Sequence, residues 1–163
     1  MIDLRRLLSR LTFAIREEVP DAAYLAKALD LDISRSRITD ARTVMTIRNA
    51  ILDGNIEIDA AWGRPPHREI CLVIAHSSLP YSKIKDETFG ANQRIVPSRY
   101  SAGFGVVFEI DGWECGYTAD SPDGDVGFVF CRKPKALGVR NRPQAGGAGM
   151  TISNLDGGVI KPD

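Results

Sequence analysis

The sequence predicts an α+β protein, in which an N-terminal three-helix cluster packs on one face of an antiparallel β-meander of about four to five strands. Two observations support this fold class. Apolar residues recur at helical spacing only up to about residue 52, and the later chain has short apolar runs separated by turn residues. No strand–helix–strand alternation is present in the pattern, so a parallel sheet is not expected.

Three helices are expected before Gly54. The first covers about residues 3–18, with Asp3 as its cap and an apolar side formed by Leu4, Leu7, Leu8, Leu11 and Ile15. Pro20 ends this helix and begins the second, which extends to about Leu29. The third is expected to start near Ser34 or Thr39 and to bury Ala41, Val44, Met45, Ile47, Ile51 and Leu52.

A hairpin centred on Asp111-Gly112 is the best-defined element. A two-residue type I′ turn needs positive φ at both central residues, and Asp and Gly tolerate that conformation. One face of the predicted hairpin pairs Ile110 with Trp113, Phe108 with Cys115, Val106 with Tyr117 and Phe104 with Ala119. The other face pairs Glu109 with Glu114, Val107 with Gly116 and Gly105 with Thr118.

Three further strands are predicted, over about residues 56–62, 69–76 and 126–132. The run 69–76 is apolar on both faces, so we expect it to be a central strand. Residues 77–102 show no convincing element beyond a helical turn around 83–88, and a loop of this length is often functional. The chain should form a single α+β domain over residues 1–135, followed by a Gly-rich C-terminal tail over 136–163.

Composition excludes several classes of protein. The formal net charge is zero, so no overall field attracts nucleic acid or an anionic membrane, and no apolar stretch approaches the ~20 residues of a membrane span. Cys71, Cys115 and Cys131 include no CxxC pair, which argues against a disulfide framework and favours a reducing compartment. Cys115 is expected to be a small buried hydrophobe. The predicted location is the cytoplasm, or a particle assembled there.

The chain carries no convergent catalytic motif, so we expect neither an enzyme nor a bound cofactor or metal. The histidines are His67 and His76, and strand alternation places His67 and Cys71 on one face and His76 on the other. One strand therefore cannot present all three to one zinc ion. Thiol chemistry at Cys71 with a distant histidine stays open as an alternative.

Two groups of residues are predicted to bind a partner. Six acids and no Lys or Arg lie between residues 109 and 125, and Glu109 should face Glu114. The two carboxylates repel each other unless nearby Lys or Arg side chains form ion pairs with them. The predicted partner-binding residues are Glu109, Glu114, Asp120, Asp123 and Asp125 in the hairpin region, and Tyr81, Arg94, Arg99 and Tyr100 in the long loop.

Residues 22–42 resemble a helix-turn-helix in their helix-forming stretch 22–29 and in Ser34-Arg35-Ser36-Arg37-Ile38-Thr39. The resemblance implies DNA binding in which Arg35, Arg37 and Arg42 contact phosphates. It departs from the motif at Asp30, which stands where the turn glycine is usual, and its spacing is about two residues longer. Nearby aspartates would also repel a phosphate backbone.

By elimination, the favoured function is a non-enzymatic protein-interaction or structural assembly subunit of phage or bacterial type. It would act through the acidic hairpin face, the long loop and the C-terminal tail, on a protein partner or on copies of itself. One alternative is an immunity or inhibitor protein that neutralises a basic partner. The other is the helix-turn-helix DNA-binding protein. Charge balance disfavours nucleic acid, and no membrane association is expected.

Overall fold

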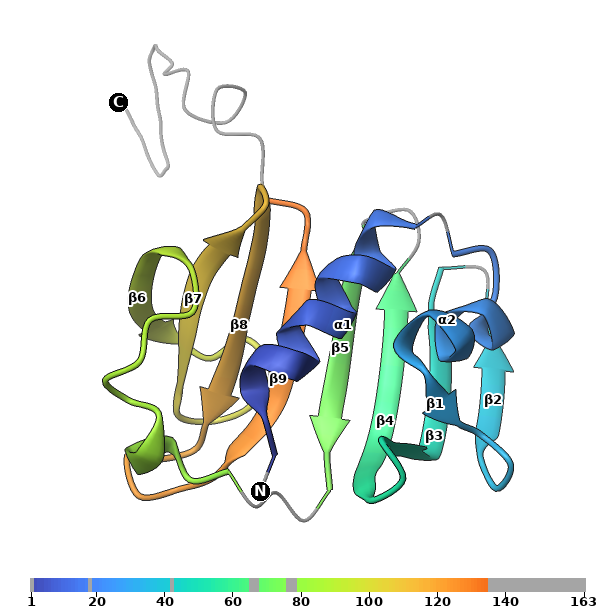
Figure 1. The fold of residues 1–163 in the computed structure, drawn as a ribbon, viewed down its shortest axis with the longest axis horizontal. Helices are drawn as coiled ribbons and strands as arrows, with labels where there is room; N and C mark the ends of the chain where they lie inside the picture. Colours follow the sequence, from blue (N-terminus) through green and yellow to red (C-terminus); the bar gives the residue numbers. More distant parts are fainter. Residues whose placement is uncertain (1, 18, 42, 65–67, 76–78, 135–163) are drawn as a thin grey trace, which may run out of the picture. The chain divides into compact units, whose positions relative to one another are not determined.

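The computed structural model describes residues 2–17, 19–41, 43–64, 68–75 and 79–134 (Figure 1). Within these residues, two N-terminal helices pack on a nine-stranded antiparallel sheet. The elements are α1 (Leu4–Arg16), α2 (Ala22–Leu29), β1 (Leu31–Asp32), β2 (Arg37–Asp40), β3 (Met45–Leu52), β4 (Ile56–Arg64), β5 (Glu69–Ile74), a 3-10 helix (Tyr81–Lys83), β6 (Ala91–Pro97), β7 (Phe104–Ile110), β8 (Trp113–Ala119) and β9 (Val126–Arg132). The α+β class is therefore confirmed, whereas three helices and four to five strands were wrong.

The sheet has the strand order β1-β3-β4-β5-β9-β8-β7-β6, and β2 pairs with β3 at the same edge as β1. β5 pairs with β4 on one side and with β9 on the other, which confirms the prediction of a central strand. The helices cover one face only: α1 crosses β9 and β5, and α2 lies over β3 (Figure 1). All these elements belong to one compact unit, Met1–Lys133, and the predicted tail lies outside the described residues.

Both helices begin at aspartates. Asp3 accepts a hydrogen bond from the Arg6 backbone N–H at 3.3 Å, and Asp21 accepts one from Tyr24 at 2.8 Å. Asp30 ends α2 in the left-handed conformation, with φ of 57°. The apolar side of α1 predicted from its spacing is buried, with Leu4, Leu7, Leu8, Leu11 and Ile15 each at most 3% exposed.

The predicted third helix is wrong, because its residues form β2 and β3 instead. The stretch is rich in β-branched residues, which favour strands over helices. Met45 and Ile47 are buried at strand spacing, but Asn49 has a φ of 62° and shifts the alternation, so that Ala50 and Leu52 are buried next. The buried residues of β3 are therefore spaced first by two, then by three and again by two residues. Such mixed spacing resembles the spacing of buried residues along a helix.

The hairpin around Asp111-Gly112 is confirmed in full. All seven residue pairs between β7 and β8 occur in the predicted register, including Glu109 opposite Glu114. Asp111 has a φ of 51° and Gly112 a φ of 83°, as a type I′ turn requires. β8 then pairs with β9, which extends the hairpin into the centre of the sheet.

Residues 77–102 are not an unstructured loop where the structure describes them. They contain the 3-10 helix and β6, which pairs with β7 and forms the other edge of the sheet. β6 gives a weak sequence signal because polar Asn92, Gln93 and Arg94 interrupt its apolar residues, its register shifts between Ala91 and Arg94, and it ends at Pro97. Edge strands tolerate all three features, since their outer side is not paired.

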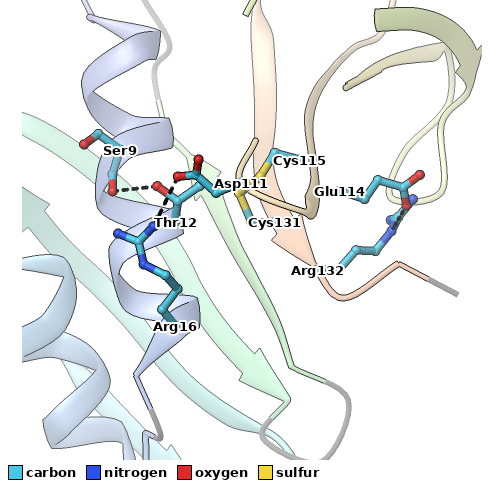
Figure 2. Close-up of a disulfide and its surroundings, with 8 residues drawn as sticks. All are labelled: Ser9, Thr12, Arg16, Asp111, Glu114, Cys115, Cys131 and Arg132. Atoms are coloured by element: carbon cyan, nitrogen blue, oxygen red, sulfur yellow. Dashed lines mark hydrogen bonds and ion pairs between the residues drawn. A yellow bond between two sulfur atoms is a disulfide. The ribbon is translucent and has the colours of Figure 1, made fainter. Parts of the chain in front are cut away.

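Cys115 and Cys131 face each other on β8 and β9 and form a disulfide (Figure 2). Both side chains are fully buried, so the prediction that Cys115 lies in the core is confirmed, but the expectation of no disulfide is wrong. Hairpin alternation predicts the face on which Cys115 lies, but not which strand lies beside it. Cys71 is a free cysteine, and its burial raises the pKa of its thiol.

Candidate functional site

The sheet face opposite the helices, here called the uncovered face, carries a second, smaller apolar cluster. Cys71, Val107 and Phe130 are buried there, apart from the main core under the helices. They are covered by Tyr100, which comes from the connection between β6 and β7. Its ring stacks on Phe128, with centroids 5.5 Å apart and planes at 15°, and it also packs against Phe130 and Trp62.

Local hydrogen bonds shape this connection. The Ser98 hydroxyl accepts from the backbone N–H groups of Tyr100 and Ser101, at 3.2 and 3.1 Å. Gly103 then returns the chain to β7 with a φ of 91°, and a Cβ there would lie 2.4 Å from the carbonyl oxygen of Ala119. The segment 98–103 is therefore bent back over the sheet by its own sequence.

The Tyr100 hydroxyl joins a network of charged residues. It donates to the carboxylate of Glu69, which is only 7% exposed, and accepts from Arg132 Nη1 at 3.2 Å. Burial, together with the hydrogen bond to Glu69 and the charge of that carboxylate, raises the pKa of the Tyr100 phenol. The phenol thus stays protonated and holds the β6–β7 connection on β5 and β9.

Glu114 is the next member of this network. Its carboxylate is held between Arg132 Nε at 2.7 Å and Arg94 Nη2 at 3.2 Å. Burial opposes the charge on Arg132, but the hydrogen bond to Glu114 and the neighbouring Tyr100 and Glu114 outweigh it and raise the pKa of the guanidinium. Figure 2 shows the Glu114–Arg132 pair on the opposite side of the strands from α1. Glu114 is therefore neutralised by arginines and is not a free acidic contact.

The acidic run predicted to bind a partner divides between two places. Glu109 is exposed beside Glu114 near the hairpin turn. Asp120, Asp123 and Asp125 are exposed in the β8–β9 turn, beyond the far end of β8. Because Asp120 follows Glu114 by six residues along a strand, the two groups lie about 20 Å apart. They do not form one acidic face.

The residues predicted in the long loop differ in exposure. Tyr81 is only 9% exposed and packs edge-on against Phe104, with centroids 4.8 Å apart, so its ring belongs to the main core. Arg99 is exposed, with its guanidinium 5.8 Å from the centroid of the Tyr100 ring. Arg94 and Tyr100 lie in the network described above. Of the long-loop set, these three lie on or beside the uncovered face.

A hollow of about 530 Å³ lies on the uncovered face over β2, β3 and β4. We call it the arginine hollow. It is lined by Arg37, Val44, Thr46, Arg48, Asn49, Asp59, Ala60, Trp62, Arg64 and Val73. Arg37 and Arg48 are direct cross-strand neighbours, and neither side chain has an ion pair or hydrogen bond to another described residue. The guanidinium of Arg64 lies over the Trp62 ring at 4.9 Å and is 3.9 Å from Glu69.

A second hollow, of about 310 Å³, lies between the helices and the ends of β4 and β5. Its apolar lining includes Ala14, Leu25 and Met45. Arg68, which also lines it, donates to the backbone carbonyl oxygens of Ile15 and Arg16 at 2.9 and 3.2 Å. These carbonyls belong to the last turn of α1, so Arg68 stabilises the end of that helix.

The structure contains no helix-turn-helix over residues 31–40, because these residues form β1, a turn and β2. Arg35 is exposed in the turn, Arg37 lies in the arginine hollow, and Arg42 is outside the described residues. Sequence reasoning missed Arg48, Trp62, Arg64, Glu69 and Arg132. Strand alternation places Trp62 and Arg64 on the same face of β4, but only the pairing of β2, β3 and β4 brings them near Arg37.

Among the described residues, no three His, Cys, Asp or Glu side chains cluster as ligands of a metal ion would, and His67 and His76 lie outside those residues. Neither described helix has the length and apolar character needed to cross a bilayer. Comparison with protein-family models, with curated proteins and with solved structures found no match to this chain. The functional proposal therefore depends on the geometry of the chain's own residues.

Proposed function

We propose that this chain is a non-enzymatic protein-interaction or assembly subunit that binds a protein partner, or another copy of itself, through the uncovered face of the sheet. The observation that carries the proposal is the asymmetry of this face. One half is closed by Tyr100 and its charged network, while the other half keeps the arginine hollow, with two arginines that have no described partner. Rigid strands with unpaired charges form a preorganised binding surface.

The titratable groups of the closed half support a binding role over acid–base catalysis. The pKa values of the Tyr100 phenol and the Cys71 thiol are both raised, in each case mainly by burial. Both groups therefore stay neutral near neutral pH, whereas a catalytic base or nucleophile needs a pKa close to the working pH or below it. Glu69 and Glu114 are each engaged by arginine or tyrosine side chains.

An inhibitor that neutralises a basic partner is a second candidate function. Asp120, Asp123 and Asp125 support it, because all three are exposed in one turn and no ion pair joins them to another described residue. Reversing these three charges would abolish such an interaction, and the association rate of the unmodified protein would depend strongly on salt.

The predicted location, cytoplasmic or in a particle assembled there, stays a prediction. The disulfide bears on it, because persistent disulfides are typical of oxidising compartments.

Site-specific photo-crosslinking in cells tests the main proposal. A photoreactive residue is placed at Thr39 or Thr46 on the uncovered face, and at the exposed positions Ser9 or Ala23 on the helices as matched controls. We expect a discrete crosslinked product from the first pair alone. Products from the helix positions alone, or from none of the four, would refute the proposal. The native mass of the purified protein at low and high salt then separates self-assembly from binding to a different protein.

A further inference from the structure

The arginine hollow contains a local repulsion that nothing in the described residues relieves. Arg37 of β2 and Arg48 of β3 are directly opposite each other. Directly opposed side chains in antiparallel strands have Cβ atoms about 4.5–5.5 Å apart, and like charges at that distance destabilise the pair. No described carboxylate forms an ion pair with either guanidinium. An anion bound between them would remove the repulsion and gain charge-assisted hydrogen bonds.

The other lining residues favour a negatively charged ligand. The hollow holds three arginines and one carboxylate, Asp59, so its lining carries an excess of two positive charges. Arg64 is already positioned by the Trp62 ring, since its guanidinium lies 4.9 Å from the ring centroid. Arg64 therefore has a fixed place beside the pair, with its charge partly balanced by Glu69 at 3.9 Å, while Arg37 and Arg48 remain able to reorganise around a ligand.

We infer that the arginine hollow binds carboxylate side chains of an extended, acidic segment of a protein partner, an inference that rests on the proposed function and specifies its partner. Two observations favour a peptide over nucleic acid. β2 lies at the edge of the sheet with all four residues exposed, and its outer row of backbone N–H and C=O groups matches the alternating donors and acceptors of another peptide strand. Asp59 in the hollow repels a continuous phosphate backbone.

The occupant would lie along β2 as an added strand. Alternate side chains of that strand point to the uncovered face, where Arg37 and Thr39 of β2 also point. An acidic residue opposite Arg37 would then lie within reach of both Arg37 and Arg48. Main-chain pairing supplies affinity in this arrangement, and the two arginines supply selectivity for acids at alternate positions.

Fluorescence anisotropy with a labelled peptide of alternating Glu and Thr tests the inference. The controls are the same peptide with Gln in place of Glu, and a single-stranded oligonucleotide of similar charge. We expect the Glu peptide alone to bind the full chain. Arg37→Gln/Arg48→Gln should weaken this binding about tenfold or more, because each charge-assisted hydrogen bond contributes a large part of the affinity. Lys27→Gln/Lys85→Gln removes two exposed cations outside the hollow and should leave binding unchanged.

Hydrogen exchange of the β2 and β3 amides gives a second readout, because an added strand should protect β2 in the presence of the Glu peptide. Equal binding to wild type and to Arg37→Gln/Arg48→Gln, or no binding of the Glu peptide at all, would overturn the inference. Tighter binding of the oligonucleotide would also overturn it and would favour nucleic acid. If crosslinks still form from Thr39 and Thr46 in any of these cases, the inference fails while the proposed function stands.

Discussion

Replacing Tyr100 with phenylalanine should destabilise the protein by about 2 kcal/mol. The substitution keeps the ring, and with it the contacts to Phe128 and Phe130, but removes the hydroxyl. Glu69 is only 7% exposed and would lose its donor, while Arg132 Nη1 would lose an acceptor at 3.2 Å. Hydrogen bonds to charged groups contribute about 1.5–3 kcal/mol, and the half-buried position of Tyr100 places the effect in the lower part of that range.

Urea unfolding followed by circular dichroism measures this change. A loss of about 2 kcal/mol should also lower Tm by about 4–8 °C for a chain of this length. The matched control is Tyr24→Phe, because the Tyr24 ring is 39% exposed and its hydroxyl lies 3.5 Å from Glu17. We expect the control to change the free energy of unfolding by less than about 0.5 kcal/mol.

Two outcomes would refute the reasoning. The first is a Tyr100→Phe variant as stable as the Tyr24→Phe control, which would show that the hydroxyl contributes nothing. The second is an equal cost of Tyr100→Phe in the wild type and in a Glu69→Ala background. The double-mutant cycle isolates the coupling between the two side chains, and a coupling near zero would mean that the hydroxyl does not act through Glu69.

The remaining predictions concern the disulfide, the arginine pair and the tyrosines. Reduction of Cys115–Cys131, which are 16 residues apart, should lower the free energy of unfolding by about 3 kcal/mol, and a thiol titration without reductant should detect only Cys71, and only after denaturation. Arg48→Thr should increase stability by about 0.5 kcal/mol at low salt by removing the repulsion from Arg37, and high salt should abolish that gain. An Arg48→Thr variant that is only as stable as the wild type at low salt would contradict this prediction. Because the folded state raises the pKa of the Tyr100 and Tyr117 phenols, it binds their protons more tightly than the unfolded state, so urea unfolding should show stability falling as the pH rises above about 10. Tyr100→Phe should make this fall shallower.

The sequence by itself determined the features that depend on neighbouring residues. The Asp111-Gly112 hairpin, its complete register, the Asp3 cap and the apolar side of α1 all follow from turn geometry, capping and periodicity within a few residues. The central position of β5 was also predictable, because a strand that is apolar on both faces must be covered on both.

Only the tertiary structure decided the features that depend on residues far apart in the chain. The backbone irregularity at Asn49 gives the buried residues of β3 a spacing that resembles that of a helix. β6 is a strand because its backbone pairs with the edge of β7. The disulfide depends on β9 lying beside β8. Arg37 and Arg48 of the arginine hollow, and Tyr100 with Glu69, come from strands or connections that no local pattern places together. Local propensity predicts an element and its faces, whereas long-range strand pairing selects which faces meet.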